Sequence, residues 1–170
     1  MAGQLIQVAT ETVTSAVSSV DLSGVNTDDV YMIAFNNVTP TTDATIMYAR
    51  IIKTDDSADS TSNYDRAFKV LRTDQAFTNG ADQNQDSFGV EQLGTGTGES
   101  ANGIMYLYNF NNSSEYNFVS FEFSNFDSAG KLIAGAGGFV HTVAQQSKGI
   151  SFYIPSNTIA GGTFTLYKVV

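Results

Sequence analysis

The 170-residue sequence contains no cysteine and no tryptophan, only two prolines and a single histidine. Without cysteine, the chain can form neither a disulfide framework nor a thiolate metal site, and it has no thiol nucleophile. No apolar run approaches the ~18 residues of a membrane-spanning helix, so we expect no membrane span. The first residues lack a basic segment followed by a long apolar run, so we expect no secretory signal.

Charged residues are also scarce. They make up 15% of the chain, and 8 basic against 17 acidic residues give a formal net charge of −9. Nucleic-acid binding depends on neutralising phosphates, so a surface of this sign argues against nucleic acid and anionic membranes as partners. The polar positions are filled instead by Ser, Thr, Asn and Gln, which is typical of rigid extracellular or virion β-proteins.

The clearest strand pattern lies in residues 159–170. Two glycines open a turn, after which Phe164 and Leu166 alternate with Thr165 and Tyr167. Strict alternation of apolar and polar residues, rich in aromatic and β-branched side chains, predicts a strand with one buried face. We expect this strand to close a sheet built from earlier parts of the chain.

Similar patterns predict further strands, and no segment has a convincing helical pattern. These strands are expected within residues 4–20 (one or two), 30–35, 44–53, 64–72, 104–110, 116–123, 131–134, 138–143 and 150–154. Residues 64–72 also fit helical spacing, but we favour a strand because every other element is one. The runs at 104–110 and 116–123 are expected to form an aromatic-rich hairpin.

The expected fold is therefore all-β: an antiparallel β-sandwich of about nine strands, jelly-roll-like and without significant helix. Residues 1–20 are expected to form an N-terminal strand or anchoring arm. Residues 21–170 are expected to form a single β-sandwich domain, because a chain of this length can bury a core of its own.

Several segments carry turn or loop signals. Residues 36–40 and Asn102-Gly103 are predicted turns, and residues 54–63 an exposed acidic loop. The glycines of 135–138 predict a bulge or sheet corner. Residues 73–101 form a long irregular stretch, and a connection of that length in a compact domain is normally either functional or ordered by a partner.

No motif supports catalysis. His141 is the only histidine, and it lies in an apolar strand, so we interpret it as a half-buried sheet residue rather than a general base. A nucleophilic serine would need a supporting motif such as Gly-x-Ser-x-Gly, which is absent from the sequence. We assign no catalytic, cofactor-binding or metal-binding residue and expect a protein that is not an enzyme.

Calcium is the one ion whose binding the sequence does not exclude. Residues 82–86 have the oxygen spacing that opens a calcium-binding loop, but the required glycine and the acid at the twelfth position are replaced by Ser87 and Leu93. A looser Ca²⁺ site remains an alternative to a solvated acidic loop. Its ligands would be Asp82, Asn84 and Asp86, or Asp55, Asp56 and Asp59.

Three stretches also carry a family resemblance: residues 30–38 (VYMIAFNNV), 62–67 (SNYDRA) and 162–167 (GTFTLY). In this order and spacing they resemble small virion structural proteins of tailed bacteriophages, particularly phages of marine bacteria. The resemblance covers roughly residues 30–170 and leaves the first 20 residues outside. It implies a jelly-roll-like scaffold used on virions, with the N-terminal segment as the place where such proteins tend to anchor.

The resemblance and the absence of a catalytic motif from the sequence together predict a non-enzymatic virion structural protein. It would decorate the capsid or form part of a tail or appendage, assembled in the host bacterial cytoplasm and acting through contacts with other virion proteins. We expect a homo-oligomer, with a trimer as the favoured state. The alternative is a receptor- or carbohydrate-binding module of a fibre or tail tip, with a host-surface glycan bound by residues 73–101 and exposed tyrosines.

Overall fold

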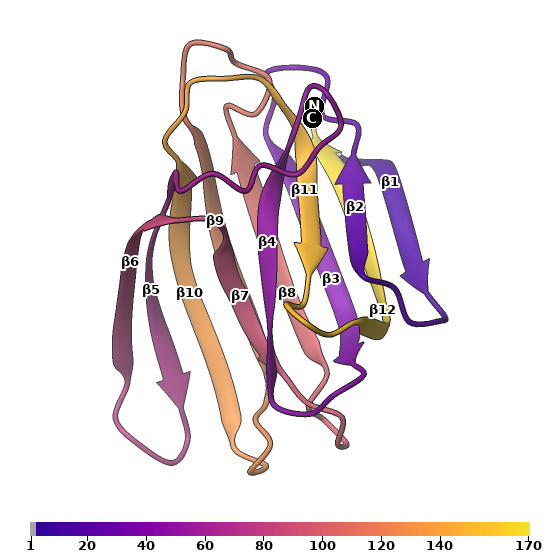
Figure 1. The fold of residues 1–170 in the computed structure, drawn as a ribbon, viewed down its shortest axis with the longest axis vertical. Coiled ribbons are helices and arrows are strands. Elements are labelled where there is room, and N and C mark those ends of the chain that lie inside the picture. The colour runs from indigo at the N-terminus through magenta and orange to yellow at the C-terminus, as the bar shows by residue number, and fades with distance from the viewer. Residues whose placement is uncertain (1–2) are drawn as a thin grey trace.

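A computed structural model describes residues 3–170. Within them the chain forms twelve strands and no helix, so none of these residues belongs to a helix that could cross a membrane (Figure 1). The strands are β1 (Leu5–Val13), β2 (Ser19–Ser23), β3 (Tyr31–Pro40), β4 (Thr45–Lys53), β5 (Tyr64–Arg72), β6 (Thr78–Gln85), β7 (Phe88–Leu93), β8 (Ala101–Tyr108), β9 (Asn117–Phe126), β10 (Leu132–His141), β11 (Ser147–Tyr153) and β12 (Ile159–Val169).

The strands form two sheets that face each other. The large sheet has eight strands in the order β1-β12-β3-β8-β9-β10-β5-β6, and the small sheet has four in the order β2-β11-β4-β7. Every pairing within them is antiparallel. The hairpins β5–β6 and β9–β10 extend the large sheet on one side, where β6 projects beyond the small sheet (Figure 1).

The core lies between the two sheets. Phe152 of the small sheet packs against Phe35 and Phe164 of the large sheet, with ring centroids 6.2 and 5.1 Å apart. Phe164 and Leu166 are fully buried, as the alternation in residues 159–170 predicts. Strand β12 lies between β1 and β3, so the last strand of the chain does complete a sheet formed by earlier segments.

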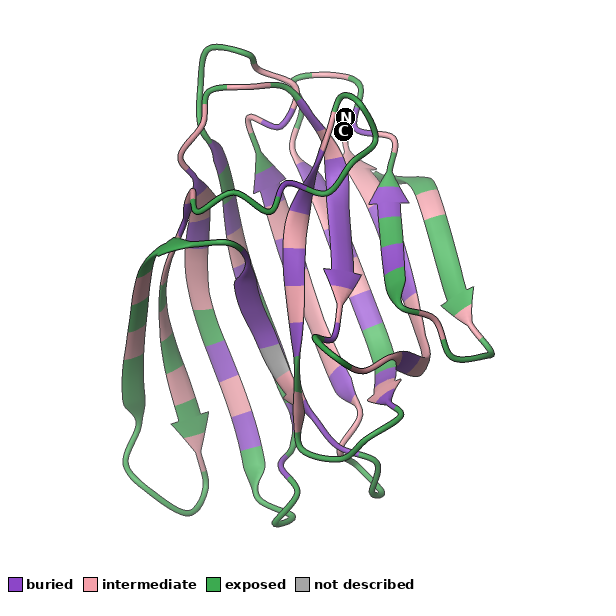
Figure 2. Ribbon diagram, in the orientation of Figure 1, coloured by how far each residue is buried: buried purple, intermediate pink, exposed green. Residues whose placement is uncertain are grey.

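The all-β, antiparallel character of the fold is thus confirmed. The ambiguous segment 64–72 is a strand, and β8 and β9 form the predicted hairpin. Along β9 the alternation is complete: Val119, Phe121 and Phe123 point into the core, while the residues between them are more exposed (Figure 2).

The expected number of about nine strands is too low, because residues 73–101 are not irregular throughout. They contain β6 and β7. Strand β6 carries no large apolar side chain and is held by pairing with β5 rather than by burial, so a search for hydrophobic periodicity misses it. Strand β7 does bury Phe88 and Val90, but its polar and glycine-rich flanks hide that short pattern.

The two predicted turns are wrong. Residues 36–40 continue β3 with an irregular register, which Asn37 accommodates with a φ of 53°. Asn102 and Gly103 lie inside β8. A Cβ atom at Gly103 would lie 2.4 Å from the ring of Phe35, so this glycine makes room for a core aromatic residue rather than for a turn.

The glycines of 135–138 do not form a corner either. Strand β10 pairs with both β5 and β9 through this segment without a register shift. A Cβ atom at Gly135 would lie 2.4 Å from the ring of Phe123, and one at Gly137 would lie 2.4 Å from the carbonyl oxygen of Ala67. Glycine is used here because neighbouring groups approach the backbone closely.

Most of the predicted N-terminal arm is part of the large sheet. Strand β1 pairs with β12 over Leu5–Val13, and Val17 forms a further bridge to Ile159. Residues 1 and 2 of the predicted arm lie outside the described residues. An anchoring role for this segment stays a prediction.

Candidate binding surfaces

The two edges of the large sheet differ in chemistry. Strand β1 forms one edge and is exposed along most of its length (Figure 2). Its nine residues include Leu5 and Ile6, which are 49% and 46% exposed, and Val8, while Glu11 is its only charged residue. A long edge strand with apolar side chains and no Lys or Pro can pair with a strand of another chain.

The opposite edge is formed by β6, whose sequence TNGADQNQ has no large apolar residue. A strand that paired with β6 would bury little apolar surface, so the hydrophobic contribution to the free energy of association would be small. The large sheet therefore has one edge suited to association and one edge that is poorly suited to it.

The outer face of the large sheet forms a second surface. No strand of residues 3–170 covers this face, since all twelve belong to the two sheets that enclose the core (Figure 1). Neighbouring strands place Tyr108, Phe118 and Val140 side by side on it, and Phe118 is 44% exposed. At the far end of the same face Phe126 lies opposite Leu132, and both side chains are exposed.

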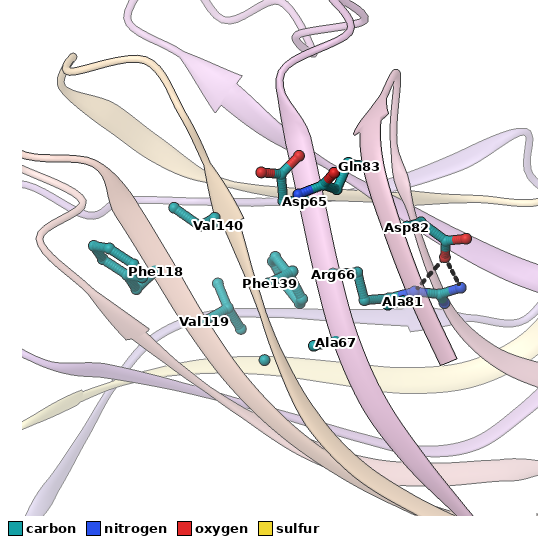
Figure 3. Close-up of a pocket in the computed structure, with 11 residues that line it drawn as sticks. Asp65, Arg66, Ala67, Ala81, Asp82, Gln83, Phe118, Val119, Phe139 and Val140 are labelled. Carbon is teal, nitrogen blue, oxygen red and sulfur yellow. Dashed lines mark hydrogen bonds and ion pairs between the residues drawn. The ribbon is translucent and has the colours of Figure 1, made fainter. Parts of the chain in front are cut away.

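A hollow of about 390 Å³ lies next to the first of these groups (Figure 3). Its floor is formed by three small residues that lie opposite one another on β10, β5 and β6 and leave space above the sheet: Gly138, Ala67 and Ala81. Phe118 and Val140 border it on one side, and Asp65 and Gln83 lie on its β5–β6 side (Figure 3). Such a hollow can receive an apolar side chain of a partner.

A more polar cleft of about 490 Å³ lies where the small sheet meets the projecting β5–β6 hairpin. Tyr48 and Tyr153 line it from the small sheet, and Arg66 lines it from β5. Residues 82–89 supply much of the opposite wall, so part of the 73–101 segment does contribute to a concave site.

A polar cluster lies in the interior around His141. This side chain is fully buried rather than half-buried as expected, and its Nε2 atom lies 3.1 Å from Oδ2 of Asp59 without good hydrogen-bond geometry. Asp59 belongs to the predicted exposed loop 54–63 but is only 6% exposed. The hydroxyl of Tyr64 donates to the carbonyl oxygen of Asp59 and accepts from the N–H of Ile51, which fixes this loop against β5.

The burial of this cluster explains its pKa shifts. Burial lowers the pKa of His141 and outweighs the attraction of Asp59, so the imidazole is neutral near pH 7. For Asp59 burial acts to raise the pKa, but hydrogen bonds from the hydroxyl and N–H of Thr61, together with the nearby histidine, outweigh it and leave the pKa lowered. Burial likewise raises the pKa of Tyr64. The cluster is enclosed, and its hydrogen bonds stabilise the fold by holding loop 54–63 against β4 and β5.

The two candidate calcium sets do not converge. Asp82 pairs with Arg66 and Asp86 with Arg50, while Asn84 donates its backbone N–H to Asp65. The second set is equally dispersed: Asp55 binds Ser57, Asp56 lies 2.7 Å from Lys148 and Asp59 contacts His141. Among the side chains that the structure describes, no group of three or more from His, Cys, Asp or Glu is arranged to hold a metal ion.

Sequence reasoning missed the residues that organise the polar cleft. Arg50 and Arg66 lie in predicted strands, and nothing in their spacing shows that both turn toward residues 82–89. The alternation of apolar residues in β4 places Arg50 on the outer face of the small sheet, and this was the one signal in the sequence that could have found it.

No family model matches the chain, and comparisons with curated proteins and with solved structures found no significant match.

Proposed function

We propose that this chain is a non-enzymatic structural protein of a bacteriophage virion, which decorates the capsid or forms part of the tail or another appendage. The observation that carries the proposal is the exposed, nearly uncharged edge strand β1. An edge of this kind gains backbone hydrogen bonds and buries apolar side chains when a neighbouring protein adds a strand to it. The N-terminal strand is thus the anchor, and other virion proteins are the partners.

The strand order supports a jelly-roll scaffold for this role. Strands β1, β12, β3 and β8 of the large sheet face β2, β11, β4 and β7 of the small sheet, and the chain passes repeatedly from one group to the other. Two four-stranded sheets connected in this way are characteristic of jelly rolls, which recur in viral capsid and lectin domains. The hairpins β5–β6 and β9–β10 are then additions to a core of eight strands.

The outer face of the large sheet supports a second contact with neighbouring subunits. Phe118 and the adjacent hollow lie on it, away from β1. Two separate contact surfaces on one chain suit a protein that sits in an array, where each copy meets more than one neighbour. We include association between copies of the chain in the proposal.

The test compares the two edges of the large sheet. Sedimentation velocity over a range of concentrations should show association of the wild-type chain and a marked loss of it in the Ile6→Lys variant, because a charge on the edge opposes strand pairing. Asn79→Lys, which places the same charge on the β6 edge, is the matched control and should leave association unchanged. Mass spectrometry of purified phage particles should detect the wild-type chain as a structural component.

Two results would contradict the proposal. One is a chain that stays monomeric at all concentrations and is absent from purified particles. The other is association that Asn79→Lys abolishes and Ile6→Lys leaves intact, because the contact would then use the β6 edge.

A further inference from the structure

The polar cleft between the small sheet and the β5–β6 hairpin has the features of a ligand site. Its volume of about 490 Å³ lies within the ~300–1,000 Å³ typical of small-ligand pockets. Gly89 lies in its floor: a Cβ atom there would lie 2.8 Å from Nη1 of Arg66 and 3.6 Å from the ring of Tyr48. A larger residue would fill the space, so the cleft depends on this glycine.

One wall of the cleft is aromatic and held in place. Tyr48 and Tyr153 lie opposite each other on β4 and β11, with ring centroids 6.0 Å apart. The guanidinium carbon of Arg50 lies 4.6 Å from the centroid of the Tyr153 ring, a cation–π contact that fixes the orientation of this ring. The faces of such rings carry partial negative charge and attract the weakly positive C–H groups of a sugar ring.

The other walls carry two ion pairs. Arg50 donates from Nη2 to Oδ2 of Asp86 at 3.0 Å and from Nε to the Asp86 carbonyl oxygen. Arg66 donates from Nε to Oδ2 of Asp82 at 3.0 Å and from Nη1 to the carbonyl oxygen of Gly89. Each arginine is therefore held by two different groups, and little side-chain entropy remains to be lost when a ligand binds.

The charges of the cleft select the class of ligand. Arg50 and Arg66 are balanced by Asp82 and Asp86, so the formal charge of the four side chains is zero. An anionic ligand would have to displace a carboxylate from its arginine, and a cationic ligand would have to displace the arginine. A neutral molecule with many hydroxyl groups can instead use the fixed planar donors and acceptors beside an aromatic wall.

We propose that this cleft binds a neutral sugar unit of a glycan, with Tyr48 and Tyr153 as the stacking wall and the two ion pairs as hydrogen-bonding groups. The site lies on the small sheet and on the β5–β6 side of the molecule, far along the sheet order from the β1 edge. Sugar binding is therefore independent of the proposed assembly contact, and a chain anchored through β1 keeps the cleft available.

The test is an array of neutral and acidic oligosaccharides, followed by calorimetric titration with the best neutral ligand. We expect binding of a neutral sugar with a Kd of roughly 0.1–1 mM, as for a single shallow site. Tyr153→Ala should weaken it by about tenfold or more, while Tyr153→Phe, which keeps the ring, should retain most of it. Tyr116→Ala, at an exposed tyrosine outside the cleft, is the matched control and should bind like the wild type.

Three outcomes would overturn the proposal: no neutral ligand on the array, binding confined to acidic glycans, or equal affinity of Tyr153→Ala and the wild type. Thermal melting of each variant shows whether a loss of binding is a loss of folding. Incorporation of Tyr153→Ala into particles is measured in parallel, because failure of sugar binding with normal incorporation leaves the assembly role intact.

Discussion

The Nε2 atom of His141 lies 3.1 Å from Oδ2 of Asp59, and both side chains are buried. His141 ends strand β10 of the large sheet, whereas Asp59 belongs to the loop that leaves β4 of the small sheet. The contact therefore joins the two sheets at one end of the molecule. It also makes the stability of the fold sensitive to protonation, because a proton on His141 would place a positive charge in the interior, and burial opposes this charge more than Asp59 favours it.

We predict that the free energy of unfolding falls as the pH is lowered below about 6.5. The folded-state pKa of His141 is lowered from 6.5, so the unfolded chain binds more protons in this range. The stabilising contribution of the neutral imidazole is complete above about pH 6.5 and is lost as the pH falls through the lower folded-state value. Asp59 adds a second loss only at lower pH, below its ordinary value of 3.8.

Urea denaturation at a series of pH values checks this prediction. His141→Gln should flatten the dependence as the pH falls below about 6.5, because it removes the titrating group. Thr142→Ser alters the neighbouring side chain without removing a titratable group and should keep the wild-type slope. A His141→Gln variant with an unchanged slope would show that other residues dominate the dependence.

The second prediction concerns Gly149 of β11. A Cβ atom at this position would lie 1.8 Å from the carbonyl oxygen of Leu22 in β2, and a backbone atom cannot move aside cheaply. Gly149→Ala should therefore destabilise the protein by about 1–3 kcal/mol. At Gly138 the nearest atom would be the carbonyl oxygen of Val119 at 3.2 Å, so Gly138→Ala should cost less. Equal midpoints of urea unfolding for the two variants would be inconsistent with this packing.

The third prediction concerns Arg66, which connects three strands. Its guanidinium binds Asp82 of β6 and the carbonyl oxygen of Gly89 in β7. Lysine has a single ammonium group and cannot bind both partners in this way, so Arg66→Lys should destabilise the protein by about 1–2 kcal/mol.

Amide hydrogen exchange checks where this loss is felt. In Arg66→Lys, exchange should accelerate most in residues 78–85 and 88–93. Lys69→Gln, on the opposite face of β5, should leave exchange in β7 unchanged, and a uniform acceleration in both variants would contradict a local role for Arg66.

The sequence predicts best those strands whose side chains alternate between core and solvent. In β12, Phe164 and Leu166 alternate with polar residues, and the structure buries both. Strand β6 shows the limit of this reasoning, because neither of its faces packs in the core and it exists through pairing with β5 and the Arg66–Asp82 contact. Glycines are ambiguous for a related reason: Gly103 carries a turn signal, but its role is set by the ring of Phe35, which is 68 positions away in the chain (103 − 35).

The candidate surfaces are harder to predict than the strands. The polar cleft combines residues of β4, β5, β6, β7 and β11, which come from both sheets and are far apart in the sequence. Residues 82–86 have calcium-like spacing in sequence, yet the structure directs Asp82 and Asp86 to different arginines. Local spacing cannot reveal such pairings, since each depends on a partner from another strand.

We propose that strand β1 docks this chain onto a virion, and cryo-electron microscopy of the phage particle that carries the chain tests this docking most directly. The proposal predicts density for the chain on the capsid or on the tail, with the large sheet continued across Leu5–Val13 by a strand of a neighbouring subunit. A particle that lacks the chain, or a reconstruction in which β1 faces open solvent while another surface makes the contact, would contradict it.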